Sequence, residues 1–323
     1  MNLFHRIPLA LGIAAAFAAG TAGAADAWPS KPIRLVVPFS AGGANDLMAR
    51  AAAEGASKAL GQPIIVDNKP GAGTALGADQ VSKSAPDGYT FLVSAAGVIS
   101  NSMIRRNMPY KDETLVPVAM IGLAPSVIVV PADAPYKDLK EFVAASKKSE
   151  SGFHWATAGT GSTPHFVEGL LETKYGAKLD LVPYKSGSES ITAVLGKQVD
   201  ATSEASIVVL PYIKAGKLKA LADTWTQRIS AYPELPTAAE QGFPDIRIAH
   251  WAGVHAPRDT PPAILDKMAA AIDAAMKTPA TADRLKGMGI EPVGGTRASF
   301  VKFVDEERAR LGGVVKATGM KED

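Results

Sequence analysis

Residues 33–46 read IRLVVPFSAGGAND, an apolar, β-branched run that leads through a glycine-rich turn into a helical pattern. The run at 33–39 is typical of a strand, and the alanine-rich stretch at 45–60, which stops just before Gly61, is typical of a helix. Short apolar strands separated by helices indicate a mostly parallel sheet that is covered on both faces. The sequence therefore predicts an α/β fold. Further strand candidates lie at residues 64–66, 90–93, 116–122, 126–130, 154–157, 179–183, 218–223 and 247–255.

A chain of 323 residues is long enough for two domains. The strand candidates at 116–130 and 247–255 lie on either side of a middle block that has its own strands and helices. The chain would then cross twice between two doubly wound lobes. Two crossings make a hinge, and a cleft between lobes is a preferred place for small ligands. The predicted boundaries are 26–125 for the first part of lobe 1, 126–248 for lobe 2 and 249–323 for the second part of lobe 1.

Two apolar stripes near the C-terminus predict helices that face the core. One stripe runs through residues 264–276 at i, i+4 spacing, and the other begins at Phe300. Ser299 precedes the second stripe and is expected to cap its helix.

The composition is that of an ordinary globular protein. With 47% hydrophobic residues, 20% charged residues and no cysteine, the chain is not disordered, collagenous or stapled by disulfides. The formal net charge is +2, and the densest basic spots are isolated pairs at 105–106 and 147–148. A nucleic-acid-binding protein would show a basic stripe interleaved with aromatic residues. We therefore expect no nucleic-acid partner.

The first 25 residues have the pattern of a secretory signal peptide. A start that contains Arg6 is followed by an apolar run at 7–19 and by small residues at 22–24. The run is too short to span a bilayer, which takes about 20 helical residues, and no cysteine is available to carry a lipid. We expect that residues 1–25 are cleaved and that the protein is periplasmic.

Motifs for nucleotide and metal chemistry are missing or incomplete. The chain has no phosphate-binding loop and no nucleophile elbow. Residues 71–77, GAGTALG, approach a dinucleotide fingerprint but have one residue too many before the third glycine, which favours packing at a helix start. His250 and His255 fall on opposite faces of a strand, and the histidines form no ligand cluster. We therefore expect no cofactor and no metal.

Ser162 and His165 raise the alternative of a hydrolase. A nucleophile needs a sharp, strained turn and an oxyanion hole, and two residues this close along one helix start are better interpreted as a cap and a first-turn residue. The chain is predicted not to be an enzyme, and no catalytic residue is assigned.

Two glycine-rich loops at strand-to-helix junctions carry the functional prediction. The first covers residues 38–46, PFSAGGAND, and the second covers residues 157–166, TAGTGSTPHF, in the other lobe. The first N–H groups of a helix lack intrahelical partners and carry partial positive charge, so a helix start binds an anion without lysine or arginine. Ser162 and Thr163 add hydroxyl donors, while Asn45 and Asp46 are expected to shape the first loop. Two such loops across a hinge predict a site for a small anion.

A series of ordered segments carries a family resemblance. It begins with WPSKPIRLVVPF at 28–39 and continues at 68–73, 85–90, 182–185, 196–200, 213–218 and 235–240. Together these segments resemble the periplasmic receptors of the Bug, or TctC-like, family, which serve tripartite tricarboxylate transporters. The resemblance implies a periplasmic binding protein of the second structural type. Its two lobes, joined by a two-crossing hinge, would close over a small carboxylate held by residues 39–46 and 157–165.

Departures from the family pattern concern the ligand. The family commonly has Tyr-Lys-Gly where residues 184–189 read YKSGSE, which is expected to reshape a loop near the cleft. Glu204 stands where a shorter aspartate or asparagine is frequent; it either contacts a ligand amino or hydroxyl group or points to solvent. Residues 94–97, SAAG, match a small, neutral turn of the cleft wall that would admit a bulky or aromatic acid as readily as an aliphatic one.

These observations predict a periplasmic solute-binding receptor, acting as a monomer. It would capture a small aliphatic, amino or aromatic acid and deliver it to the membrane permease of a tripartite tricarboxylate-type transporter. A carboxylate sensor of a signalling system is an alternative, and a secreted esterase-like hydrolase is a less favoured one. The predicted ligand-binding residues are Phe39, Ser40, Ala41, Gly42, Gly43, Asp46, Ser94, Ala95, Gly159, Thr160, Gly161, Ser162, Thr163, His165, Tyr184, Glu204 and Ser206.

Overall fold

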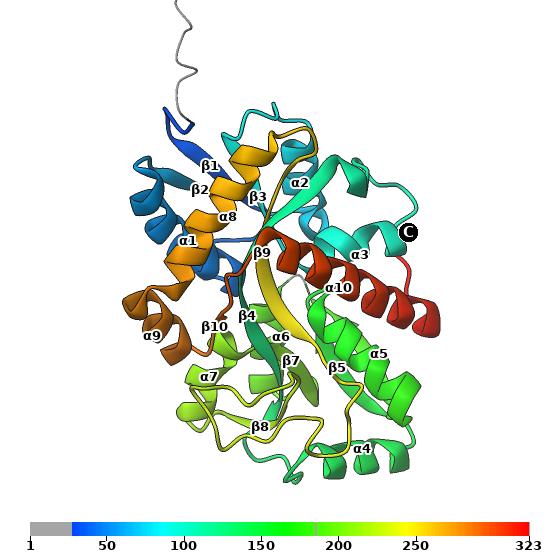
Figure 1. Cartoon of the computed structure of the whole chain (residues 1–323). Coiled ribbons are helices and arrows are strands. Elements are labelled where there is room, and N and C mark those ends of the chain that lie inside the picture. The colour runs from blue at the N-terminus through cyan, green and yellow to red at the C-terminus, as the bar shows by residue number, and fades with distance from the viewer. Residues whose placement is uncertain (1–27, 185, 323) are drawn as a thin grey trace, which may run out of the picture.

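The computed structural model describes residues 28–184 and 186–322, so the predicted signal peptide lies outside the described residues. The chain forms two lobes, one above the other in Figure 1, with two long strands passing between them. The strands are β1 (Ile33–Val37), β2 (Ile64–Asn68), β3 (Thr90–Ser94), β4 (Leu115–Pro131), β5 (Phe153–Thr157), β6 (Leu179–Pro183), β7 (Ala201–Ala205), β8 (Leu218–Asp223), β9 (Ala249–Pro257) and β10 (Glu291–Pro292).

Helices follow most of the strands, as the alternating pattern of the sequence predicts. In the part of the chain that the structure describes, no helix is both long and apolar enough to cross a membrane. The α-helices are α1 (Ala44–Leu60), α2 (Ala75–Ser82), α3 (Ala96–Ile104), α4 (Leu139–Lys148), α5 (Thr163–Tyr175), α6 (Gly187–Leu195), α7 (Ser206–Lys214), α8 (Pro262–Lys277), α9 (Pro279–Gly287) and α10 (Arg297–Thr318); the short 3₁₀ helices are η1 (Ala72–Thr74) and η2 (Asp112–Thr114).

Each lobe has a parallel core of three strands. β1 lies between β2 and β3, β5 lies between β6 and β7, and all four of these pairs are parallel. β9 pairs antiparallel with β3 and β4, and β4 pairs antiparallel with β7, β8 and β10. The predicted α/β class with two crossings is confirmed. The sheet is mixed rather than mostly parallel, because β4 leaves one lobe and β9 returns to it in the opposite direction.

β4 is one continuous strand, whereas the sequence predicts two strands at 116–122 and 126–130. As far as Pro125 it pairs with β9, and from Ser126 onward it pairs with β7. Pro125 interrupts the apolar pattern and has no N–H to donate, but it lies where the strand changes partners. The predicted lobe boundary at 125/126 falls inside this strand and the boundary at 248/249 at the start of β9; both boundaries stay predictions.

The hydrophobic cores form where helices pack their apolar faces on the sheet. In the lobe of β1 to β3, α1 and α8 cover the sheet and bury Met48 and Met268. In the other lobe, α4 and α5 bury Phe142 and Phe166 beside Trp155 of β5. α10 packs against both α3 and α5, so it contacts both lobes.

α10 begins earlier than the sequence predicts. Its N-cap is Thr296, whose Oγ1 accepts a hydrogen bond from Ser299 N at 3.2 Å. The hydroxyl of Ser299 donates to the carbonyl of Thr296, so Ser299 lies inside the first turn. The expectation that Ser299 caps the helix is wrong, because the helix extends back to the glycine turn at Gly294 and Gly295, where φ is positive.

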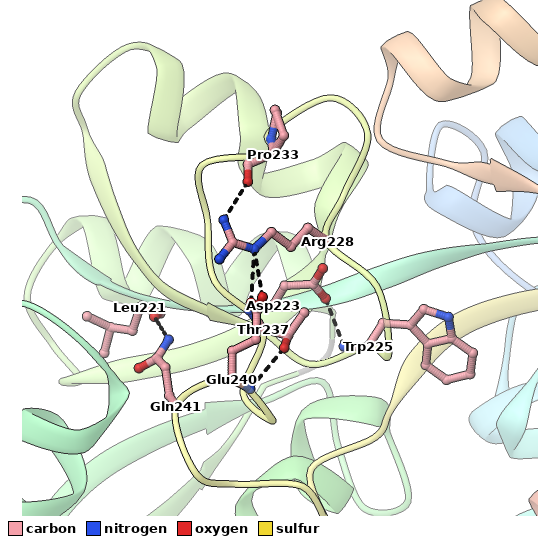
Figure 2. A network of polar contacts seen from close by, with 8 residues as sticks. All are labelled: Leu221, Asp223, Trp225, Arg228, Pro233, Thr237, Glu240 and Gln241. Atoms are coloured by element: carbon pink, nitrogen blue, oxygen red, sulfur yellow. Dashed lines mark hydrogen bonds and ion pairs between the residues drawn. The ribbon is translucent and has the colours of Figure 1, made fainter.

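A polar network holds the long loop between β8 and β9 (Figure 2). Glu240 Oε2 accepts from Thr237 N at 2.7 Å, and Thr237 Oγ1 accepts from Glu240 N at 3.1 Å. Arg228 donates to both carboxylate oxygens of Glu240 and to the carbonyl of Pro233. Gln241 Nε2 donates to a carbonyl of β8 at 2.8 Å. The family-like LPTAAE segment therefore fastens this loop to the sheet.

Gly253 of β9 is a position of close approach, because a Cβ there would lie 2.1 Å from Phe300 Cζ of α10. We predict that Gly253→Ala displaces α10 and lowers the free energy of unfolding by about 1–3 kcal/mol, as overpacking does. Denaturant unfolding measures this change. The matched control is Gly313→Ala in α10, where a Cβ would meet nothing within 4 Å; it should be neutral or stabilising by about 0.5–1 kcal/mol. Equal stability of wild type and Gly253→Ala would contradict the packing argument.

Candidate functional site

Four strands, two in each lobe, are each followed along the chain by a helix that begins near their carboxyl ends. α1, α3, α5 and α7 follow β1, β3, β5 and β7, and their N-cap residues are Gly43, Ala95, Ser162 and Ala205. Within the described chain, none of these four residues makes a side-chain capping hydrogen bond. Side chains do cap α4 and α10. The first-turn N–H groups at these strand ends therefore lack side-chain partners and create positive potential.

The first loop owes its shape to Gly42, whose φ of +84° lies in the region that favours glycine. Gly43 has an ordinary φ of −77°. Ser40, Ala41 and Gly42 are exposed, while Phe39 is half-buried. The loop therefore presents its backbone at the surface, immediately before the start of α1.

Asp46 is buried beneath this loop. Its Oδ2 accepts hydrogen bonds from Gly42 N and Arg50 Nε, each at 2.9 Å, and its Oδ1 accepts from Asn68 Nδ2 at 2.8 Å. Burial by itself would raise the pKa of the Asp46 carboxyl, but the bonds from Arg50, Gly42 and Asn68 outweigh it and hold the pKa below its usual value. This carboxylate shapes the loop, as the sequence suggested, and the N–H of Gly42 is already used.

Asn45 ties the first loop to a strand that both lobes share. Its Nδ2 donates to the carbonyl of Trp251 on β9 at 2.8 Å, in a buried bond. Because β9 passes between the lobes, the position of the loop is set relative to the crossing. This supports the expected role of Asn45 in shaping the loop.

The second loop contains two glycines with positive φ, Gly159 at +97° and Gly161 at +74°. Thr157 Oγ1 accepts a hydrogen bond from Gly159 N, and His165 Nδ1 accepts one from Gly161 N, each at 3.3 Å. Burial lowers the pKa of His165 to about 4, so its imidazole is neutral near neutral pH and can accept this bond. His165 therefore helps to shape the loop.

Ser162 presents an unused hydroxyl group at the start of α5, next to the buried Thr163. Its Oγ is buried and has no hydrogen-bond partner among residues 28–184 and 186–322. Buried polar atoms are nearly always paired, so this hydroxyl is a candidate ligand contact. The structure gives it no bond to His165, which leaves the hydrolase alternative without a contact between nucleophile and base.

The second loop touches α3 of the other lobe. A Cβ on Gly161 would lie 2.7 Å from Ile104 Cδ1 and 3.9 Å from Ser100 Oγ. The Oγ of Ser100 is also buried without a partner in the described part of the chain. Unpaired hydroxyls from both lobes, Ser100 and Ser162, therefore flank this contact. The sequence did not indicate Ser100, because a single serine inside a helical pattern carries no signal.

The hydroxyl groups of Ser94 and Ser206 make hydrogen bonds within the fold. Ser94 Oγ lies 2.7 Å from His255 Nδ1, and Ser206 Oγ donates to the carbonyl of Gly289 at 2.5 Å. Burial lowers the pKa of His255 to about 3, so this imidazole is uncharged. Both serines lie at strand ends beside the loops, but their side chains contribute first to packing between elements.

Thr160 and Tyr184 complete the set of predicted residues, and both are half-buried. The N–H of Tyr184 donates to the last carbonyl of β5 at 2.8 Å. This bond places the segment after β6 beside the second loop.

Glu204 lies at the carboxyl end of β7 and is buried. Burial raises the pKa of its carboxyl to about 8. Its Oε2 lies 4.0 Å from Nε2 of His250, whose pKa burial lowers to about 4. Both groups are therefore uncharged near neutral pH. The alternative that Glu204 points to solvent is wrong, and a contact with the ligand stays a prediction.

The glycines of the fingerprint-like stretch at 71–77 pack against protein atoms. A Cβ on Gly77 would lie 2.8 Å from Pro38 Cβ, and one on Gly73 would lie 2.8 Å from Arg105 Nη2. η1 separates β2 from α2, so the helix does not start directly after the strand as a dinucleotide site requires. Across the described ranges, no three His, Cys, Asp or Glu side chains are grouped to hold a metal ion.

Comparisons with known proteins agree with this geometry. The sequence model of the tripartite tricarboxylate transporter family receptor, TctC, matches residues 48–320. Protein BugT of Bordetella pertussis (strain Tohama I) is 35% identical over 300 residues, which cover 92% of each chain. The solved structure of the periplasmic binding protein BugD has a TM-score of 0.81 at 31% identity, covering 92% of this chain and all of BugD.

Two further solved structures contain ligands. An R. palustris protein with adipate has a TM-score of 0.84 at 30% identity, covering 91% of this chain and 99% of its own. MatC from Rhodopseudomonas palustris with bound malate has a TM-score of 0.79 at 30% identity, covering 89% of this chain and 99% of its own.

Fold, loops and comparisons together define a two-lobed solute-binding protein of the periplasmic type, not an enzyme. The chain belongs to the tripartite tricarboxylate transporter receptor family, TctC, and is similar to the Bug proteins. The family that the ordered sequence segments predict is thereby confirmed.

We predict that Asp46→Ala lowers the free energy of unfolding by about 1–3 kcal/mol at pH 7, because it leaves buried donors unpaired. The folded-state pKa of Asp46 lies below its unfolded value, so this contribution is present at neutral pH and is lost as the pH falls through the folded-state pKa. Urea unfolding at pH 7 and pH 3 should show a smaller difference in acid. Asp283→Ala, at an exposed position on α9, is the control and should change stability by less than about 0.5 kcal/mol. An equal loss at both pH values would contradict this role.

Proposed function

We propose that this protein captures a small organic acid, most favourably one with two carboxylates, between its lobes and delivers it to the permease of a tripartite tricarboxylate-type transporter. The observation that carries the proposal is the pair of helix starts at α1 and α5. Each follows a glycine-rich loop, each lacks a side-chain cap, and they belong to different lobes. The relatives solved with adipate and with malate support an acid with two carboxylates.

Backbone N–H groups would supply most of the binding energy. One carboxylate of the ligand would accept hydrogen bonds from the first turn of α1, and the start of α5 would contribute amides and the hydroxyl of Ser162. Hydrogen bonds to charged groups contribute roughly 1.5–3 kcal/mol each, so two to four of them offset the cost of taking a carboxylate out of water. The small, uncharged residues of the loops let the ligand approach the backbone closely.

The lobes would close because the ligand contacts loops from both of them. A ligand that touches both loops makes contacts in the closed state that the open state lacks, so binding shifts the hinge equilibrium toward closure. β4 and β9 connect the lobes at the proposed boundaries, 125/126 and 248/249. The closed form would then be the species that the permease recognises.

Export would precede this function. We propose cleavage of residues 1–25 and action in the periplasm as a monomer. Membership of a family of transporter receptors supports this location.

A ligand screen tests the proposal. The mature protein is heated with succinate, malate, adipate and benzoate, and with glycerol as an uncharged control. A ligand at 100 times its Kd stabilises the folded protein by about 2.7 kcal/mol, which raises the Tm measurably. We expect such a shift with at least one of the acids and none with glycerol. If none of the acids raises the Tm, the proposed function is wrong.

We predict that Gly43→Asp abolishes carboxylate binding, weakening it at least about 100-fold, because the new charge repels the ligand at the start of α1. The fold should tolerate the change, since φ is −77° and a Cβ would lie 3.6 Å from Ser40 O, an ordinary contact. Titration calorimetry measures the affinity, and the Tm without ligand verifies folding. Gly43→Ala adds the same Cβ without the charge and should keep binding. Unchanged affinity of Gly43→Asp would exclude the first loop.

We predict that Ser162→Ala weakens binding by about 1 kcal/mol, or roughly fivefold in Kd, through loss of one hydrogen bond. It should not lower stability, because the Oγ has no partner in the described chain. The control is Ser151→Ala, which precedes the opposite end of β5. If Ser162→Ala binds as tightly as Ser151→Ala, the hydroxyl is no ligand contact.

A further inference from the structure

Glu204 carries a carboxyl group that the fold buries and leaves with one oxygen unpaired in the described chain. Its side chain is 7% exposed, and its Oε1 has no hydrogen-bond partner among the residues that the structure describes. The basic group facing it, Nε2 of His250, is 4.0 Å from Oε2 and is likewise unpartnered there. A separation of 4.0 Å is too long for a hydrogen bond. The carboxyl group of Glu204 and the imidazole of His250 therefore face one another without a hydrogen bond between them, and each has an atom that could still bond to a ligand.

The carboxyl group lies beside the second loop. β7 runs parallel to β5 with Thr202 opposite Ala156, and continuing this register places Glu204 next to Ala158, where the loop begins. The start of α6 covers it, because a Cβ on Gly187 would lie 2.6 Å from both carboxyl oxygens. Only glycine leaves this space open. The carboxyl group of Glu204 therefore lies between the second loop and the start of α6.

His250 connects the pair to the first loop. It precedes Trp251, whose carbonyl holds the amide of Asn45. The side chain of His250 is 16% exposed, so the pair is not sealed from the surface. Glu204 and His250 thus lie between the anchor of one loop and the beginning of the other, close to where the lobes join.

Among the residues that the structure describes, no cation near Glu204 would favour its ionised form. Burial raises its pKa, a backbone hydrogen bond from Ala205 opposes the rise, and neither His165 nor His250 is charged near neutral pH. Asp223, at the end of β8, is separated from it by β4. The titratable groups on the elements packed against β7 are His154 on β5, His165, Glu168, Glu172, Lys174 and Tyr175 on α5, Glu189 on α6, and Tyr212 and Lys214 on α7, while β4 has none.

We propose that Glu204 is a specificity-determining residue that keeps its proton and donates it in an O–H···O hydrogen bond to a carboxylate of the ligand. This inference rests on the proposed function and narrows the ligand to acids that present a carboxylate, rather than an ammonium group, at this end. A carboxylate leaves Glu204 in the protonation state that burial already favours. An ammonium group would require the proton to leave.

The proposal has a defined dependence on pH. A hydrogen bond from a neutral acid to a carboxylate is charge-assisted and strong. Above the pKa of Glu204, about 8, the free protein loses the proton, and the ligand must meet a like charge or restore the proton. Affinity is therefore constant at pH 6–7 and falls toward about tenfold per pH unit at higher pH, with one proton taken up on binding.

Calorimetry of the mature protein tests these consequences with ligand pairs of matched length. Adipate is compared with 6-aminohexanoate, and succinate with 4-aminobutanoate, from pH 6 to pH 9.5. We expect the dicarboxylate of the better-binding pair to bind at least about tenfold more tightly. Titrations at pH 9 in buffers of different ionisation enthalpy should show uptake of close to one proton. A preference for the amino acid, or binding without proton uptake at pH 9, overturns the proposal.

Three variants separate this role from a merely structural one. Glu204→Gln keeps an N–H donor but has no titratable proton, so it loses the pH dependence and binds more tightly than wild type at pH 9. Glu204→Ala loses the donor and weakens binding at pH 6 about tenfold or more. Glu306→Gln, at an exposed position of α10, keeps the wild-type pH profile. The Tm of each variant verifies folding.

The outcomes distinguish this inference from the proposed function. If no acid binds at pH 6, both fail. If dicarboxylates bind with a flat pH profile in the wild type, or if Glu204→Ala binds them as the wild type does, only the role of Glu204 is wrong. A flat profile is the result expected if a water molecule alone satisfies the Glu204 and His250 pair.

Discussion

The antiparallel pairing of β4 with β9 is the constraint on which the rest of the structure depends. These two strands pair along residues 115–125 and 249–257, and β4 then continues into the sheet of the other lobe. The first loop is anchored to β9 through Asn45, and α10 packs on the same strand at Gly253. Loops from distant parts of the chain are therefore positioned relative to one shared ribbon.

The electrostatics of the site come mainly from the backbone. The Asp46 carboxylate accepts hydrogen bonds from Arg50, Gly42 and Asn68, so its charge stabilises the first loop. His165 and His250 are neutral near neutral pH because they are buried. The starts of α1, α3, α5 and α7 remain as sources of positive potential without side-chain caps. A site of this kind would hold an anion by dipoles that the fold has already oriented, so that they need no reorganisation when the ligand enters.

Much of the fold and part of the site could be predicted from local patterns. α1 was expected at 45–60 and occupies Ala44–Leu60, with Gly61 at its C-cap in the left-handed conformation. Gly42, Gly159 and Gly161 mark positive-φ turns at the helix starts. Local patterns failed where residues distant in the chain decide how a strand pairs. The sequence predicts separate strands at 116–122 and 126–130, but β4 continues through Pro125, where it exchanges β9 for β7. The hydroxyl groups of Ser94 and Ser206 bond to His255 and to the carbonyl of Gly289, which no local pattern indicates, and both residues stay predicted ligand contacts.

The sequence by itself determined the α/β class, the glycine-rich helix starts and the family, because periodicity, turn chemistry and ordered motifs are properties of neighbouring residues. Only the tertiary structure decided which polar groups have partners. The hydroxyl groups of Ser100 and Ser162 and the Oε1 of Glu204 have no partner within the described chain, while Glu204 faces His250 from another strand. Partnership, burial and protonation state depend on residues far apart in the chain that folding brings together, so no local pattern encodes them.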